Sequence, residues 1–95
     1  MILKDGFMGT SPTKGNNPEL WNKLLDVLDE RLQLGLLDKM RRVATYHFED
    51  NLLIIEAGTD EDEQYLKKST SLQQLVIFAE DATKVKEVRI KPRSE

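Results

Sequence analysis

The sequence holds a single histidine, His47, which is the first candidate for acid–base chemistry because histidine ordinarily titrates near neutral pH. His47 and Glu49 lie two residues apart in a segment of alternating polarity, which places both side chains on one face of a β-strand. A carboxylate beside an imidazole can orient it as a general base. The alternative is a solvated sheet face, because a lone histidine seldom forms a site. We favour the solvated face and predict no catalytic residue and no enzyme.

The acidic run from Asp60 to Glu63 raises the question of a metal site. It lacks the ligand spacing and the glycine bend of a calcium loop. Four acids directly after Thr59 suit the first turn of a helix, where carboxylates face the positive end of the dipole and threonine can cap. The chain has no cysteine, which excludes disulfides and thiolate metal sites. We expect no metal and no cofactor.

Basic residues gather near the C-terminus and could contact nucleic acid. They are Lys84, Lys86, Arg89 and Lys91. The net charge of −3 gives no general attraction to phosphates, and the aromatic residues that could stack on bases, Tyr46 and Phe48, are expected to face the core. Lysines also protect the edge strands of sheets. Nucleic-acid binding is therefore the alternative function and not the favoured one.

The expected elements that position these residues are a tail followed by two helices. Residues 1–16 are rich in turn-forming residues and are expected to be a disordered tail. Asn17-Pro18-Glu19 then provides a cap, a first-turn proline and a first-turn acid. From Leu20 to Gln33 the apolar residues fall in one arc of a helix, which Gly35 is expected to end. A second, shorter helix follows, with Leu36, Leu37, Met40 and Val43 at helical spacing.

The remaining elements complete an α+β domain. Residues 45–49 and 52–57 read as a β-hairpin around Asp50-Asn51. One broken helix or two helices follow from Thr59, and residues 84–91 read as a last strand. The order ααββααβ predicts a three-stranded sheet with helices on one face. If the third strand lies beside the first, the sheet is wholly antiparallel. We expect one interaction domain over residues 17–92, with residues 93–95 as a tail.

A protein interface is the remaining candidate for function. The apolar arc of the first helix is wider than a small core requires, and Trp21, Leu25 and Leu32 lie close in angle along it. Tryptophan often dominates the energetics of interfaces. Trp21 could equally close the end of the core, and the spacing does not decide between these interpretations. The three residues are the predicted partner-binding set.

The hydrophobic pattern also resembles a bacterial family. Leu20-Trp21-X-X-Leu24-Leu25-X-X-Leu28, a short helix and a hairpin with Asn51-Leu52-Leu53-Ile54-Ile55 look like the N-terminal domain of the replication initiator DnaA. They are also similar to the related C-terminal domain of the clamp-loader tau subunit, both of KH-like fold. The resemblance spans roughly residues 17–91. The initiator's Pro-Asn-X-Phe stretch is replaced here by Gly58-Thr59-Asp60-Glu61, and residues 65–90 look more like the tau domain.

The resemblance implies a non-catalytic adaptor of the bacterial replication machinery. Its partner would be a polymerase, clamp-loader or helicase component, and Trp21 matches a tryptophan that the initiator family associates with self-association. The alternative that remains is a KH-like nucleic-acid binder using the basic C-terminal strand. The longest apolar run, Leu52 to Ile55, is far too short to span a bilayer. The absence of cysteine favours the cytoplasm.

Overall fold

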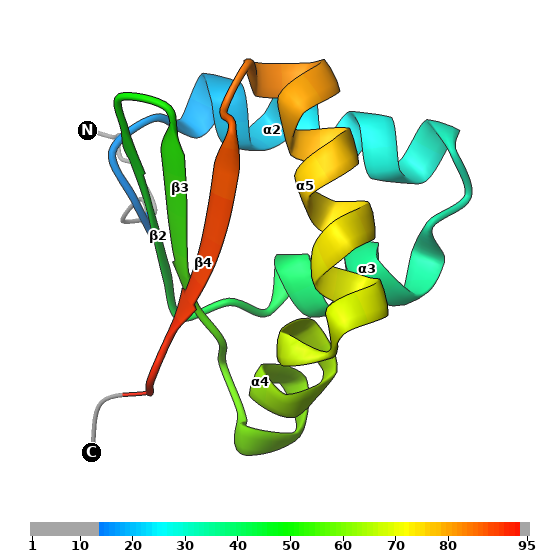
Figure 1. Cartoon of the computed structure of the whole chain (residues 1–95), viewed down its shortest axis with the longest axis vertical. Coiled ribbons are helices and arrows are strands. Elements are labelled where there is room, and N and C mark those ends of the chain that lie inside the picture. Colours follow the sequence, from blue (N-terminus) through cyan, green and yellow to red (C-terminus); the bar gives the residue numbers. More distant parts are fainter. Residues whose placement is uncertain (1–13, 94–95) are drawn as a thin grey trace, which may run out of the picture.

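The computed structural model describes residues 14–93 of the 95-residue chain and shows an α+β fold (Figure 1). The described elements are α2 (Pro18–Glu30), α3 (Leu34–Arg41), β2 (Thr45–Glu49), β3 (Leu52–Glu56), α4 (Asp60–Lys67), α5 (Ser69–Thr83) and β4 (Glu87–Lys91). This is the predicted order ααββααβ. The segment expected as one broken helix or two is two helices, because the extended backbone of Lys68 separates α4 from α5.

The sheet is mixed, with strand order β2-β3-β4. β2 and β3 pair antiparallel around the expected Asp50-Asn51 turn, and β4 pairs parallel to β3. The wholly antiparallel sheet, which required the third strand to lie beside the first, does not form. The apolar β3 takes the central place, and the two-helix crossover brings β4 back parallel to it.

The core lies between one face of this sheet and the helices (Figure 1). Tyr46 and Phe48 face it from β2, as predicted, and Leu53, Ile55 and Val88 from the other two strands. Leu24 and Leu28 of α2, Met40 of α3, Leu66 of α4 and Leu75 of α5 are fully buried against them. The opposite sheet face carries Thr45, His47 and Glu49 of β2 and is not covered by the helices.

Residues 14–16, the end of the segment expected to be a tail, lie along the outer edge of β2. The carbonyl of Lys14 accepts a hydrogen bond from the Tyr46 N–H at 3.2 Å. The Asn16 side-chain amide donates to the Phe48 carbonyl at 2.7 Å and accepts from the Phe48 N–H at 2.8 Å. Asn16 therefore satisfies edge groups of β2 as a neighbouring strand would. The rest of the expected tail, residues 1–13, and residues 94–95 lie outside the described residues.

Candidate protein-binding surface

The end of α2 is built around a leucine in a backbone conformation that normally belongs to glycine. Leu32 has a φ of 59°, and its N–H donates to the Asp29 carbonyl at 3.0 Å while the Gln33 N–H donates to the Leu28 carbonyl at 2.8 Å. These two bonds define a Schellman motif with Leu32 at its left-handed position. The prediction that Gly35 ends this helix is wrong. α2 ends at Glu30, and Gly35 lies in the first turn of α3.

The Leu32 side chain contributes almost nothing to the core. It is 76% exposed, since the helix ends before the apolar arc reaches it. A left-handed backbone costs a residue other than glycine about 1–2 kcal/mol. Neither the backbone conformation nor the core therefore requires a leucine at position 32. Leu34, two residues later at the start of α3, is also 56% exposed.

α5 contributes a third exposed apolar side chain beside the end of α2. Ile77 is 62% exposed and lines a hollow of about 540 Å³ together with Arg31 and Lys84. The Arg31 guanidinium lies 3.8 Å from the carboxylate of Asp81, which joins the end of α2 to α5. Leu32 does not line this hollow, but it directly follows Arg31, which does. We name Arg31, Leu32, Ile77 and this hollow the α2–α5 surface. Its apolar groups are rimmed by charges of both signs, which is typical of protein-binding patches.

The three predicted partner-binding residues do not share one surface. Trp21 is 7% exposed and stacks on Tyr46 with ring centroids 4.3 Å apart and an interplanar angle of 3°. Its burial agrees with the interpretation that Trp21 closes the end of the core, and not with an exposed anchor. Leu25 is half-buried beside it, where both line a shallow groove of about 260 Å³. Of the three residues, only Leu32 is exposed to solvent.

The burial of Tyr46 at this end of the core determines the protonation state of its phenol. Burial raises the pKa of Tyr46, and the backbone N–H of Asn17 lowers it by a smaller amount. The phenol is therefore neutral across the physiological range. Tyr46 serves as a packing partner for Trp21 and, in an edge-on contact at 5.7 Å between ring centroids, for Phe48.

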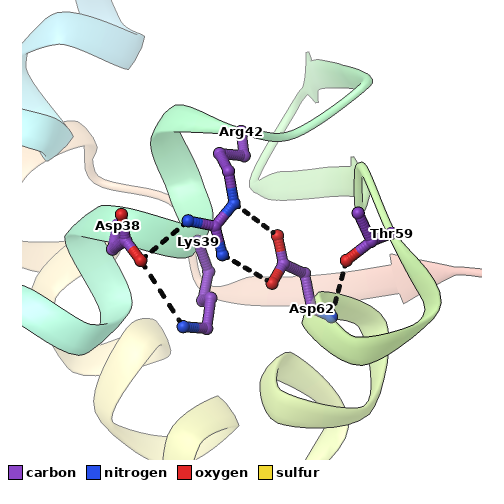
Figure 2. Close-up of polar contacts among 5 residues, drawn as sticks. All are labelled: Asp38, Lys39, Arg42, Thr59 and Asp62. Carbon is purple, nitrogen blue, oxygen red and sulfur yellow. Dashed lines mark hydrogen bonds and ion pairs between the residues drawn. The ribbon is translucent and has the colours of Figure 1, made fainter.

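The most buried ionic cluster joins α3 to α4 (Figure 2). Arg42 donates two hydrogen bonds to the Asp62 carboxylate, from Nε at 3.0 Å and from Nη2 at 2.8 Å. A third bond runs from Nη1 to Asp38 at 2.8 Å. The Asp62 N–H also donates to the Thr59 hydroxyl at 3.1 Å, so the predicted threonine cap of α4 is confirmed. The sequence does not reveal this cluster, because Arg42 and Asp62 lie 20 residues apart.

The chemistry of this cluster is structural. Asp62 is 1% exposed, and hydrogen bonds from Arg42 hold the pKa of its carboxyl below the usual value in spite of the desolvation that raises it. The hydrogen bonds with Asp62 and Asp38 raise the pKa of Arg42 in turn. No buried side-chain polar atom among residues 14–93 lacks a hydrogen-bond partner. A carboxylate this well satisfied is a poor proton donor or nucleophile.

The predicted acid–base pair lies on the uncovered sheet face. Nε2 of His47 and Oε1 of Glu49 are 3.6 Å apart, and both side chains are more than half exposed. Neither residue lines either of the two hollows described above. Within residues 14–93, no group of three or more histidines and acids has the geometry to hold a metal ion. The arrangement is that of a solvated sheet face.

The four basic residues considered for nucleic acid lie at the end of α5 and along β4. Lys84 has a left-handed backbone at the end of α5 and precedes β4, which begins only at Glu87. Lys86 lies 3.0 Å from Glu80, Arg89 lies 3.1 Å from Glu87, and Lys91 lies 3.6 Å from Glu56. These carboxylates reduce the positive potential that a phosphate backbone would follow.

Comparisons with protein-family models, with curated proteins and with solved structures found no match. Across residues 14–93, no helix combines the length and apolar character needed to cross a bilayer. The class that the fold and surface define is a three-stranded α+β domain with an exposed apolar surface at one end of its helical layer.

The exposure of Ile77 could have been predicted from the sequence, because the five apolar residues from Leu75 to Ala79 are too many for one helix face.

Proposed function

We propose that this chain is a non-catalytic adaptor domain that binds a partner protein through its α2–α5 surface. The observation that carries the proposal is Leu32, a leucine in a strained left-handed conformation with its side chain 76% exposed. A strained residue that its own fold does not use is typical of functional sites. Ile77 adds a second exposed apolar group, and the adjoining hollow can receive a partner's side chain.

The partner we propose is a component of the bacterial DNA replication machinery, in the cytoplasm. One observation supports it: the residue pattern from Leu20 to Ile55 resembles the DnaA N-terminal domain and the tau C-terminal domain. A second copy of this chain, bound through the same surface, is the other protein partner that we consider. The burial of Trp21 moves the proposed contact from the start of α2 to its end.

A binding experiment with purified proteins tests this proposal. The 95-residue chain is immobilised and exposed to the bacterial polymerase catalytic subunit, the clamp-loader complex and the replicative helicase, each on its own. We expect one of them to bind, and Ile77→Asp and Leu32→Asp to weaken that binding at least tenfold, since each places a charge in a desolvated contact. Gln74→Asp is the matched control, because Gln74 is exposed on α5 but does not line the hollow.

The alternatives are decided in the same experiment. Binding to none of the three proteins, or binding that both α2–α5 variants retain, contradicts the proposal. The nucleic-acid alternative predicts that a fluorescent single strand binds at low salt, that binding weakens steeply as salt rises, and that Lys86→Ala and Arg89→Ala reduce it. Analytical ultracentrifugation of the chain alone detects self-association, which Ile77→Asp should abolish if it uses this surface.

A further inference from the structure

β4 is an outer strand of the sheet, and its second edge faces away from β3. Among residues 14–93 no strand pairs with that edge. The opposite outer strand, β2, differs in this respect, since Lys14 and Asn16 occupy its edge. An unpaired strand edge presents a row of backbone donors and acceptors to an incoming chain. Within the part of the chain that the structure describes, β4 is therefore the strand whose outer edge is available for pairing.

A groove runs between β4 and one face of α5. Ser69, Leu72, Gln73 and Val76 line it from the helix, and Val88 lines it from the strand. The four helix positions have the spacing i, i+3, i+4 and i+7, which is a single stripe along α5. Leu72 and Val76 are half-buried, and the hollow between the two elements measures about 330 Å³. Figure 1 shows α5 running beside β4 along this side of the sheet.

The groove has a defined end. Glu80 continues the helix stripe one turn after Val76, and its carboxylate lies 3.0 Å from Nζ of Lys86, directly before β4. Glu80 and Lys86 line the hollow of the α2–α5 surface and not the groove, so this ion pair lies at the boundary between the two. The two surfaces therefore lie on the same helix but are separate.

Alternation along an added strand would divide its side chains between two environments. Side chains on one face would enter the apolar groove beside Val88, and those on the other would lie beside the outward residues of β4. The outward residues include Arg89 and Lys91, whose side chains are 63% and 49% exposed. Residues 84–93 contain five cations and one acid. The ion pair of Arg89 is with the exposed carboxylate of Glu87, and such a pair is weak enough to exchange for a partner's carboxylate.

We propose that the β4 edge and this groove bind an extended peptide segment of a partner protein, in which apolar residues alternate with acidic ones. The segment adds to the sheet as a fourth strand, with main-chain hydrogen bonds for affinity and the groove for specificity. A second copy of this chain is a poorer occupant, because pairing two β4 strands would bring their cations face to face. This site is additional to the α2–α5 surface and does not depend on the function proposed for it.

The test is an NMR titration of the ¹⁵N-labelled 95-residue chain. The probe is a blocked seven-residue peptide of alternating glutamate and valine, and the control probe carries lysine in place of glutamate. We expect amide shifts confined to β4 and to residues 69–76 of α5, with the lysine peptide binding at least threefold more weakly. A single exposed charge pair accounts for up to about a fivefold change in affinity.

Three variants test the apolar and the charged parts of the proposal separately. Gln73→Glu places a charge in the groove and should weaken binding about three- to fivefold, whereas Gln74→Glu adds the same charge outside the groove and should leave binding unchanged. Arg89→Glu should weaken the glutamate peptide and strengthen the lysine peptide. Both glutamines and Arg89 are exposed, so these variants are expected to fold.

Several results would overturn the proposal. Shifts at Leu32 and Ile77 but not at β4, or equal losses from Gln73→Glu and Gln74→Glu, exclude the groove as the site. Shifts in β4 that depend on protein concentration without peptide identify a second copy as the occupant, and shifts by single-stranded nucleic acid alone identify phosphates. Leu32→Asp should leave peptide binding intact, so a failure at the α2–α5 surface is distinguishable from a failure here.

Discussion

Replacing Leu32 with glycine should make this protein more stable and a weaker binder. The variant relieves a left-handed conformation that costs a leucine about 1–2 kcal/mol. Glycine offsets about 0.4–1 kcal/mol of that gain, because it increases the conformational entropy of the unfolded chain. The side chain that is lost is 76% exposed, so little buried area disappears with it. With the midpoints of these two ranges, the net expectation is a gain of about 0.8 kcal/mol in the free energy of unfolding.

Urea denaturation followed by circular dichroism measures this gain, and thermal unfolding should show a rise of about 2–8 °C for a domain of this size. Leu32→Ala is the matched control. It removes the same apolar side chain but keeps a Cβ in the left-handed conformation, so it should weaken partner binding without the gain in stability. A Leu32→Gly protein less stable than the parent would refute the reasoning, because it would show that the leucine supports the fold.

Three further predictions concern the fold that carries the surfaces. Asp62→Asn should lower the free energy of unfolding by about 1.5–3 kcal/mol at neutral pH, because it removes the charge that Arg42 binds. The parent's advantage is complete above the unfolded-state pKa of 3.8 and is lost as the pH falls through the lower folded-state value, so the two proteins should converge in acid titrations followed by fluorescence. Trp21→Ala should lose about 3–5 kcal/mol by urea denaturation, whereas a loss under 1 kcal/mol would contradict its place in the core. Gly58→Ala should cost about 1–3 kcal/mol in the same assay, since its Cβ would overlap the backbone carbonyl of Arg42 and a backbone atom cannot yield as a side chain can.

The elements of the fold were predictable because their signals are local. The Asn17 cap, the Asp50-Asn51 turn and the Thr59 cap are each set by a few neighbouring residues, and the structure confirms all three. The place of the third strand was not predictable in this way. Whether β4 joins β2 or β3 depends on which strand is central, and the alternation of side chains within β4 is the same in either case.

The candidate surface was only partly predictable, and its most informative residue was selected for an incomplete reason. Leu32 was chosen as part of the apolar arc of a helix extending to Gln33, but the helix ends at Glu30. Because the backbone turns left-handed at Leu32, its side chain leaves the arc that buries Trp21 and half-buries Leu25. An arc drawn on an ideal helix cannot show where the helix ends. The ending here uses no glycine or asparagine, which are the residues that normally reveal it.

That missing glycine is the strongest argument that the end of α2 serves a purpose beyond folding. The Schellman motif forms with both of its hydrogen bonds in place, so a glycine at position 32 would serve the helix better than leucine does. The Asp50 turn is a useful contrast, because aspartate tolerates a positive φ and a turn residue is expected there. At Leu32 the strain has no such local reason. The proposed partner binding would supply one, because an apolar side chain held outward at a helix end loses little conformational freedom when it is buried in a partner.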